Sequence, residues 1–158
     1  MTNIDETDRR IVELLQNDGS LSNVALGHLL NISEATVRRR RSRLEEEDVI
    51  RIVAVADPFK LGFAIMAIIG VQTQRTKLAD VEQALKQMPQ VRFLGVTLGA
   101  YDLMLEAWFR TNNELLTFVT ETLAHIDGIT RTESFQIMRL SKYTYDWGTP
   151  PAAQHHID

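Results

Sequence analysis

Residues 33–46 read Ser-Glu-Ala-Thr-Val-Arg-Arg-Arg-Arg-Ser-Arg-Leu-Glu-Glu, and the N-terminal part of the fold can be worked out from them. Ser33 is a favourable helix N-cap, and Val37 and Leu44 fall on one side of a helix that turns about 100° per residue. The opposite side carries small residues and guanidinium groups, namely Ala35, Arg39 and Ser42, with Thr36, Arg38 and Arg43 on its flanks. The pattern predicts a helix with an apolar inner side and a basic outer side.

The basic outer side favours contact with a nucleic acid. Small residues let a helix approach base edges closely, and arginine side chains make bidentate contacts to guanine or bind phosphates. The alternative is a solvated helix whose arginines pair with acids four residues on, as in Arg41–Glu45 and Arg43–Glu47. Arg41 does not fit the outer side, since it lies only about 40° from Val37. Its side chain must therefore reach past the core or pair with an acid such as Glu45.

Two shorter helical patterns precede this helix. Residues 4–17 begin with Asp5 as an N-cap and Asp8 as its capping-box partner, and an apolar stripe follows. Residues 22–30 form the second pattern, and Asn31 suits the left-handed position that ends a helix. Helix, short turn and basic helix in this order are typical of the helix-turn-helix motif. The residues expected at DNA are Ser22, Asn23, Ser33, Ala35, Thr36, Arg38, Arg39, Ser42 and Arg43.

The composition excludes several classes of protein. The chain has 158 residues, 44% hydrophobic and 24% charged, which is typical of a globular protein. It has no cysteine, so disulfides, zinc fingers and iron–sulfur clusters are excluded. No apolar run approaches the roughly 20 residues that span a bilayer and no signal peptide is recognisable, so we expect a cytoplasmic protein without a membrane partner. The net charge is −4, yet residues 38–43 hold five arginines, and a polyanion would meet that local field.

The second half of the chain alternates strand and helix patterns. We expect strands at residues 63–74, 91–98, 101–109 and 129–140, and helices at residues 78–88 and 115–123. The order βαββαβ is that of a ferredoxin-like domain. The whole chain is therefore assigned to the α+β class, with an N-terminal helix-turn-helix domain and a C-terminal ferredoxin-like domain.

Turn residues mark the boundary between the two domains. A strand is expected at residues 50–56, and Asp57, Pro58 and Gly62 interrupt the chain after it. The expected domains are residues 1–56 for the helix-turn-helix with its linking strand, 57–62 for a hinge, 63–145 for the ferredoxin-like domain and 146–158 for a loosely ordered tail.

The sheet of the second domain has one face without a predicted cover. Residues 63–74 are apolar on both faces, and Met104 and Trp108 lie opposite the leucines of the third strand. A strand that is apolar on both sides should be buried on both sides, and the two helices cover only one. We expect the open face to pack on a second copy in a symmetric dimer. The alternative is that the tail, with Trp147, covers it.

Catalytic chemistry is not indicated. His28 and His125 fall in separate predicted helices, and His155 and His156 lie in the tail, so each is expected to be an ordinary imidazole. No zinc-protease motif, phosphate-binding loop or nucleophile elbow occurs. We therefore expect no enzyme, catalytic residue, cofactor or metal site.

The turn Gly99-Ala100-Tyr101-Asp102 has two interpretations. In one, glycine permits the turn, Tyr101 packs and Asp102 caps a backbone amide. In the other, Asp102 and neighbouring amides hold the ammonium and carboxylate groups of a small zwitterion. The residues alone favour neither.

A set of short motifs, taken in order, resembles the Lrp/AsnC (leucine-responsive regulator/AsnC) family of transcription factors. The motifs are Ile4-Asp5-x-x-Asp8-x-x-Ile11-x-x-x-Leu15-Gln16-x-Asp18-Gly19; Leu21-Ser22-Asn23; Ile32-Ser33-x-x-Thr36-Val37-x-x-Arg40-x-x-x-Leu44-Glu45; Val49-Ile50; Asp57-Pro58-x-x-Leu61-Gly62; and Gly99-x-Tyr101-Asp102. They extend from residue 4 to about residue 102, and the strand order continues the likeness to about residue 140. Each piece is weak alone, but the ordered set is specific.

The resemblance implies a regulator that binds double-stranded DNA and an amino acid or related small molecule. In this family the C-terminal domain builds dimers that commonly assemble further, and amino acids often bind between dimers. The Gly-x-Tyr-Asp turn typically lines the effector site. By this resemblance the effector residues are Gly99, Tyr101 and Asp102, with Thr97 and Ala100 as neighbours and Thr132 and Ser134 contributed by another subunit.

Three residues depart from the family pattern. The family usually has an apolar residue where Arg41 stands and a glycine where Asp48 stands, and it often has a proline where Glu34 stands. These departures indicate altered packing, turn geometry or site preference. Two other functions are kept as alternatives: an assembly partner of a related regulator without its own DNA site, and a tetrapyrrole decarboxylase of similar architecture.

Overall fold

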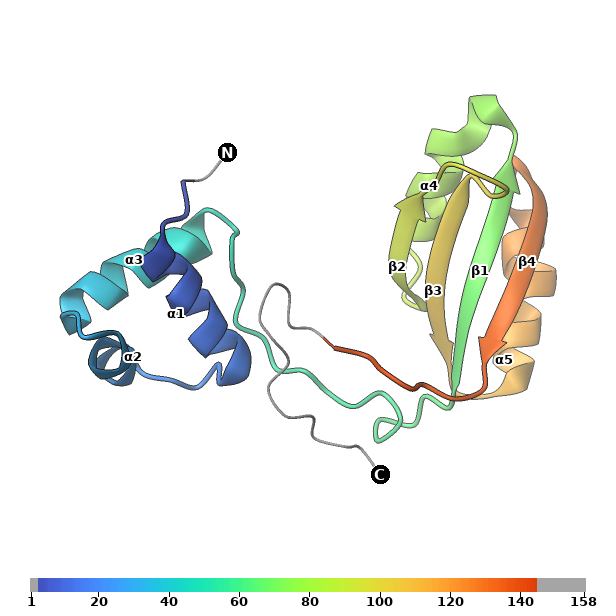
Figure 1. Ribbon diagram of the computed structural model, residues 1–158. Helices are drawn as coiled ribbons and strands as arrows, with labels where there is room; N and C mark the ends of the chain where they lie inside the picture. The colour runs from blue at the N-terminus through green and yellow to red at the C-terminus, as the bar shows by residue number, and fades with distance from the viewer. Residues whose placement is uncertain (1–2, 145–158) are drawn as a thin grey trace. The chain divides into compact units, whose positions relative to one another are not determined.

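Three helices form the N-terminal unit of the computed structural model, which describes residues 3–144 (Figure 1). They are α1 (Glu6–Asn17), α2 (Asn23–Leu30) and α3 (Glu34–Glu46). Their inward side chains share one apolar core, in which Ile11, Leu15, Leu26, Val37 and Leu44 are buried. The predicted helices at residues 4–17, 22–30 and 33–46 are confirmed to within two residues at each end.

The turn between α2 and α3 is tight. Asn31 ends α2 in the left-handed conformation, with φ of 54°, as its residue type predicted. The amide of Ile32 donates to the carbonyl of Gly27 at 3.0 Å. A β-carbon added at Gly27 would lie 2.8 Å from the carbonyl oxygen of Ile32. Only glycine therefore fits at this position of α2, against which the turn packs on its way to α3.

The second unit runs from Ala56 to Ser141 and contains a four-stranded antiparallel sheet. Its strands are β1 (Ile65–Thr73), β2 (Val91–Val96), β3 (Leu103–Phe109) and β4 (Ile129–Ile137), in the spatial order β2-β3-β1-β4. The helices are η1 (Arg75–Lys77) with α4 (Leu78–Lys86), and α5 (Asn112–Thr117) continued by η2 (Phe118–Thr122) and η3 (Leu123–His125). The predicted βαββαβ order and α+β class are confirmed.

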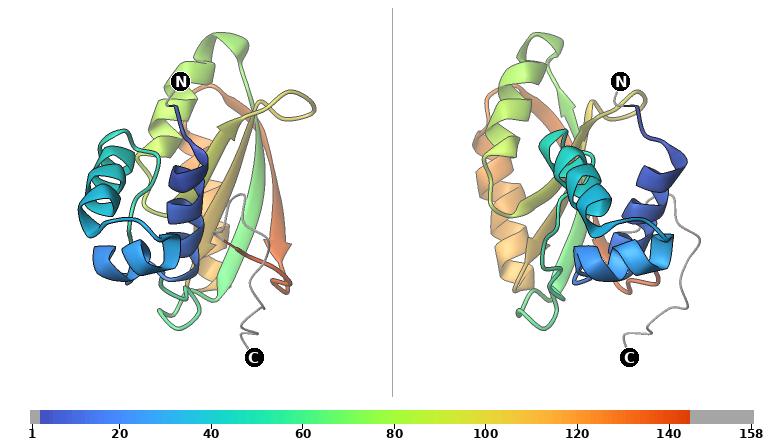
Figure 2. Two further views of the ribbon diagram at one scale, coloured as in Figure 1. Left: turned by 60° about the vertical axis from the view of Figure 1, so that its left-hand side comes forward. Right: turned by 90° about the vertical axis from the view of Figure 1, so that its left-hand side faces the viewer.

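The helices all lie on one face of the sheet, as Figures 1 and 2 show. The main core lies between them and the sheet. It is built from the odd-numbered positions of the two central strands, where Ile69 faces Leu105 and Val71 faces Leu103. Val81 of α4 packs onto it and is also fully buried. The alternation predicted for β3, with leucines inward and Met104 and Trp108 outward, is confirmed.

The strand predicted at residues 50–56 is not formed within the single chain. No strand of the described chain pairs with these residues, and only the amide of Ile50 is bonded, to the carbonyl of Leu44 at 3.2 Å. Their side chains are nevertheless apolar and exposed, with Ile52 at 42%, Val53 at 62% and Val55 at 59%. Residues 50–56 thus have the β-propensity of a strand, but no neighbouring strand of the described chain forms a hydrogen-bond ladder with them.

Residues 57–62 form an ordered turn attached to the sheet. The Asp57 carboxylate accepts the amide of Phe59 at 2.9 Å, and Gly62 adopts a positive φ of 87°. Arg110 donates to the carbonyl of Leu61 at 3.1 Å. The turn that we expected to act as a hinge is thus bound to the second unit.

The open face of the sheet is partly covered by the same turn. The ring of Phe59 meets that of Trp108 edge-on, with centroids 5.5 Å apart, and Trp108 is 95% buried. The indole of Trp108 donates to the buried carboxylate of Glu106 at 2.5 Å. Farther along this face Phe93 and Phe135 remain exposed. The tail containing Trp147, the predicted alternative cover, lies outside the described residues.

Candidate nucleic-acid interface and candidate effector turn

The outer side of α3 carries the exposed residues that its periodicity predicts. Val37 and Leu44 are fully buried on the inner side. Ala35, Arg38, Arg39 and Ser42 are exposed, while Thr36 and Arg43 are partly buried on the flanks. A small residue and guanidinium groups thus share the surface that a groove would meet.

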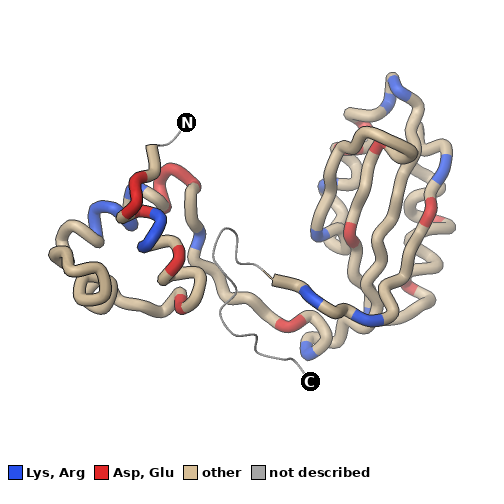
Figure 3. Tube along the Cα trace, in the orientation of Figure 1, with Lys and Arg blue, Asp and Glu red and all other residues tan. Residues whose placement is uncertain are grey.

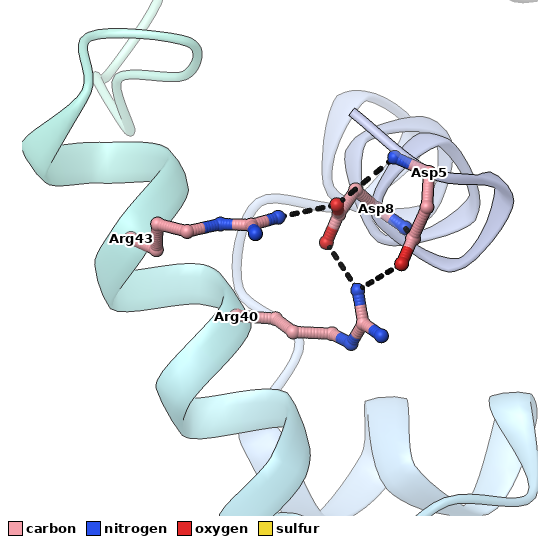
Figure 4. A network of polar contacts seen from close by, with 4 residues as sticks. All are labelled: Asp5, Asp8, Arg40 and Arg43. Atoms are coloured by element: carbon pink, nitrogen blue, oxygen red, sulfur yellow. Dashed lines mark hydrogen bonds and ion pairs between the residues drawn. The ribbon is translucent and has the colours of Figure 1, made fainter. Parts of the chain in front are cut away.

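Arg40 and Arg43 point to α1 instead of solvent (Figure 4). The carboxylate of Asp8, which is fully buried, accepts from Arg40 at 2.8 Å through one oxygen and from Arg43 through the other. Asp5 also accepts from Arg40, at 2.7 Å. A buried carboxylate needs hydrogen-bonded partners, and two guanidinium groups supply them here. These contacts fix α3 against α1.

The acids of this network also cap α1. Asp5 accepts the amide of Asp8 at 2.9 Å, and Asp8 accepts the amide of Asp5 at 3.2 Å, which completes the predicted capping box. The bond from the Asp8 amide, and then that from Arg40, lower the pKa of Asp5 below its ordinary 3.8. The bonds to Asp5 and then Asp8 raise the pKa of Arg40. One pair of acids therefore both starts α1 and binds α3.

Figure 3 shows the basic positions that follow one another along α3. The side chains of the remaining arginines differ in how far they are paired. Arg41 donates to Glu45 at 2.9 Å and to the carbonyl of Leu21 at 3.4 Å, so the predicted pairing of this inward residue is confirmed. Arg38 donates to Glu34 at 3.2 Å through its Nε, and this bond raises its pKa. Arg39 makes no side-chain hydrogen bond or ion pair within residues 3–144.

The polar residues expected at DNA first serve as helix caps. Ser22 caps α2 through the amide of Ala25 at 3.1 Å, and Ser33 caps α3 through the amide of Thr36 at 3.2 Å. The hydroxyls of Ser33 and Thr36 lie 2.8 Å apart. The side-chain oxygen of Asn23 is buried without a hydrogen-bond partner. These residues stand at the N-terminal ends of α2 and α3, where backbone amides favour anions.

The end of α3 explains one departure from the family pattern. Asp48 has a positive φ of 53°, the left-handed conformation that glycine adopts without strain. Aspartate tolerates this region better than most residues. The amide of Val49 then donates to the carbonyl of Leu44 at 2.9 Å, which closes the helix. The turn keeps a glycine-like geometry without glycine.

The turn between β2 and β3 is held by hydrogen bonds between side chains and backbone groups. Thr97 donates through its hydroxyl to the carbonyl of Tyr101 at 2.6 Å. Gly99 has a φ of 142°, and an added β-carbon would meet no atom within 4 Å. The carboxylate of Asp102 accepts the amide of Thr73 at 2.7 Å. Asp102 thus does what the first interpretation of the turn required, and Ala100 accepts from Gln72 at 2.8 Å.

Tyr101 lies across the open face of the sheet. A β-carbon at Gly70 would meet its ring at 2.6 Å, so glycine makes the space that the ring fills. The phenol donates to the carboxylate of Glu133. This bond, together with burial, raises the pKa of Tyr101 above its ordinary 10.0. The guanidinium of Arg131 lies 3.6 Å from the same carboxylate, so the phenol is close to one negatively and one positively charged side chain.

The structure does not bring Thr132 and Ser134 to Tyr101. Thr132 pairs with Val71 and Ser134 with Ile69, whose side chains face the helices. Cross-strand partners share a face, so both predicted residues lie on the opposite side of the sheet from the Tyr101 ring. Glu133, paired with Gly70, is the residue of β4 that reaches the ring. Glu133 and Gly70 were not predicted from the sequence, although a glycine inside an apolar strand is a signal of close approach.

Metal and membrane features are not found in the described part of the chain. No group of three or more histidine, aspartate or glutamate side chains among residues 3–144 could hold a metal ion. His125 contacts the carbonyl of Glu121 through Nδ1. His155 and His156 lie outside the described residues. Over the same stretch, no helix has the length and apolar character needed to cross a membrane.

Comparison with known proteins defines the class. Residues 4–45 match the model of the AsnC-type helix-turn-helix domain, and residues 66–147 match that of the Lrp/AsnC ligand-binding domain. An uncharacterised HTH-type transcriptional regulator of Pyrococcus abyssi is 38% identical over 143 residues, which is 90% of each chain. The regulator LrpA of Pyrococcus horikoshii is 34% identical over 129 residues, 81% of this chain and 92% of its own.

Solved structures show the same fold. A transcriptional regulator of Neisseria meningitidis, crystallised as an L-Met complex, is 27% identical and aligns with a TM-score of 0.83 over 90% of this chain and 95% of its own. AsnC of E. coli aligns with a TM-score of 0.84 over 90% and 97%, at 20% identity. The chain belongs to the Lrp/AsnC family of helix-turn-helix transcriptional regulators.

Proposed function

We propose that α3 reads DNA through its outer side, with Arg39 as the principal base-reading residue. The observation that carries this proposal is the exposed guanidinium of Arg39, unpaired within the described residues, between the small residues Ala35 and Ser42. Arginine in that position can make a bidentate contact to guanine. Arg38 is the second groove residue, and Ser22, Asn23, Ser33 and Thr36 meet the phosphates. A phosphate contact by Arg43 competes with its bond to Asp8.

The regulator works as a dimer in this proposal. Phe93 (58% exposed), Phe135 (47%) and Leu98 (103%) are apolar side chains that a single chain leaves in water. Packing with a second copy would bury them, and residues 50–56 could then find the strand partner that they lack. A dimer presents two recognition helices to successive major grooves, so the operator is a pseudo-palindrome with half-sites about one helical turn apart.

An amino acid or a similar small molecule controls the regulator in this proposal. The L-Met complex of the Neisseria relative supports an amino-acid effector. We assign the site to the turn of Thr97, Gly99, Ala100, Tyr101 and Asp102, with Glu133 added, at a contact between copies. Thr132 and Ser134 belong to it only if another subunit approaches the helix side of β4. Effector binding changes DNA affinity through assembly or dimer geometry.

This function is regulatory and located in the cytoplasm, where the DNA is. Family membership favours it over a tetrapyrrole decarboxylase, and the exposed outer side of α3 favours it over an assembly partner without a DNA site. We propose no catalytic step, cofactor or membrane partner.

Fluorescence anisotropy on the DNA upstream of the protein's own gene tests the proposal. The titration is run with and without a mixture of the twenty amino acids, at two salt concentrations. Sequence-specific binding that the mixture alters supports both the DNA and the effector assignments, and leaving out one amino acid at a time identifies the effector. Specific binding that ignores the mixture contradicts the effector assignment alone. Binding no tighter than to random DNA here and at every site recovered from genomic DNA contradicts the DNA assignment.

A further inference from the structure

The arginines of α3 have built-in counterions, and these divide into two kinds. Asp8, which is fully buried, holds Arg40 and Arg43, and Glu45 holds Arg41; the side chains of these arginines are 22%, 41% and 24% exposed. The Glu34–Arg38 pair is different, because both side chains are on the exposed side, at 39% and 63%. It is therefore the pair that DNA can reach.

Glu34 occupies the first turn of α3. That end of a recognition helix enters the major groove, close to the two phosphate backbones. A carboxylate there suits the helix dipole but repels phosphate. It also accepts two donors of the Arg38 guanidinium, Nε at 3.2 Å and Nη2. A phosphate would compete for the same donors.

We propose that Glu34 is an internal competitor of DNA for Arg38, which lowers the affinity of the regulator for duplexes of any sequence. While Arg38 stays on Glu34 it releases no counterion from DNA, so it adds nothing to the salt dependence of binding. Arg39 remains the unpaired arginine of the helix within residues 3–144. Residues 38–43 contain five arginines, but because acids of the protein pair with most of them, the positive charge that they present to DNA is much smaller than five.

This inference rests on the proposed DNA-binding function, and the test separates the two. The full-length protein first selects duplexes from a pool of random sequence. If no preferred sequence emerges, the proposed function fails. If one emerges, wild type and Glu34→Gln are titrated on that duplex and on a random duplex over a range of salt.

The expected result for Glu34→Gln is tighter binding to both duplexes, by about fivefold for a dimer, because exposed ion pairs of this kind are weak. The plot of log K against log salt should steepen by about 0.9 for each arginine released. Arg38→Ala in the Glu34→Gln background should cancel most of the gain, which attributes it to the freed guanidinium.

Glu13→Gln is the matched control. Glu13 pairs with Arg10 at 2.6 Å on α1, so the variant removes the same charge and a similar exposed pair outside the recognition helix. Three outcomes would overturn the inference. In one, Glu34→Gln behaves like this control on both duplexes, which leaves Glu34 as a helix-stabilising acid. In another, it weakens binding only to the selected duplex, which makes Glu34 a reader of a base. In the third, the gain in affinity survives Arg38→Ala.

Discussion

The carboxylate of Asp8 and the guanidinium of Arg40 lie 2.8 Å apart, and they join the first helix to the recognition helix across 32 residues of sequence. Arg43 binds the other oxygen of the same carboxylate. Asp8 is fully buried, and a buried acid needs such hydrogen-bonded partners. The orientation of the outer side of α3 is thus determined by an acid of α1 that is not itself exposed.

Asp8→Ala should lower the free energy of unfolding by about 2 to 3 kcal/mol. The substitution leaves two guanidinium groups beside the core without their carboxylate. The loss of stability is moderated because the side chains of Arg40 and Arg43 are 22% and 41% exposed, so water can reach them. Urea unfolding followed by circular dichroism measures it. Glu13→Ala, which removes an exposed partner of Arg10, should change the same quantity by less than about 0.5 kcal/mol. Equal effects of the two variants would contradict the role of Asp8.

Asp5 should make this unit sensitive to acid. Its pKa is lowered in the folded state, so its contribution to stability is complete above the ordinary value of 3.8 and is lost as the pH falls towards the lowered value. Asp5→Asn keeps an N-cap but removes the charge that Arg40 binds. Between about pH 5 and about pH 3 the wild type should lose stability more steeply than this variant. Parallel pH profiles of the urea midpoint would show that Asp5 makes no such contribution.

Gly27→Ala should destabilise the helix-turn-helix by about 1 to 3 kcal/mol, because its new β-carbon would lie 2.8 Å from the backbone oxygen of Ile32. The sign of this change in stability is informative, because alanine inside a helix is otherwise more stable than glycine. Gly19→Ala is the control, as its β-carbon would have only ordinary contacts, the nearest at 3.6 Å. Thermal unfolding of both variants decides the matter. A stabilised Gly27→Ala protein would mean that Gly27 and the carbonyl of Ile32 are not in this close contact.

Two substitutions near Tyr101 should move its pKa in opposite directions. Glu133→Gln removes the carboxylate that binds the phenol, so the raised pKa should fall towards 10.0. Arg131→Ala removes a positive charge that favours the phenolate, so the pKa should rise further. Ultraviolet titration of the tyrosines measures both shifts. A titration curve that neither substitution changes would show that Tyr101 and Glu133 are not in contact.

The sequence predicted α3 well because a helix repeats locally. Its buried and exposed sides follow from 100° per residue, and the inward position of Arg41 and its pairing with Glu45 were predicted in the same way. Contacts between different helices and strands were harder to predict from the sequence. Asp8 and Arg43 are 35 residues apart, and periodicity gives the face of a helix but not the neighbour that it meets.

In the second unit, too, local pattern was predictable from the sequence and contacts between elements were not. The βαββαβ order and the inward side of β3 follow from local alternation. The strand expected at residues 50–56 is absent from the single chain, because pairing needs a partner that propensity does not supply. Thr132 and Ser134 were expected from another subunit and stay a prediction, whereas Glu133 of the same chain, which strand register places beside Tyr101, was not predicted. A shift of one residue changes the face, and register depends on the neighbouring strand.

Arg39→Ala is the variant that tests most directly whether the outer side of α3 reads DNA. The measurement is anisotropy on a duplex that the wild-type protein selects from random sequence, with Arg75→Ala as a control at an exposed arginine of η1. We predict that Arg39→Ala keeps the wild-type unfolding curve, weakens selected binding by about tenfold or more and loses the preference at one base pair. The control should bind like wild type. Unchanged affinity and sequence preference in a folded Arg39→Ala protein would contradict the assignment of α3 as the recognition helix read through Arg39.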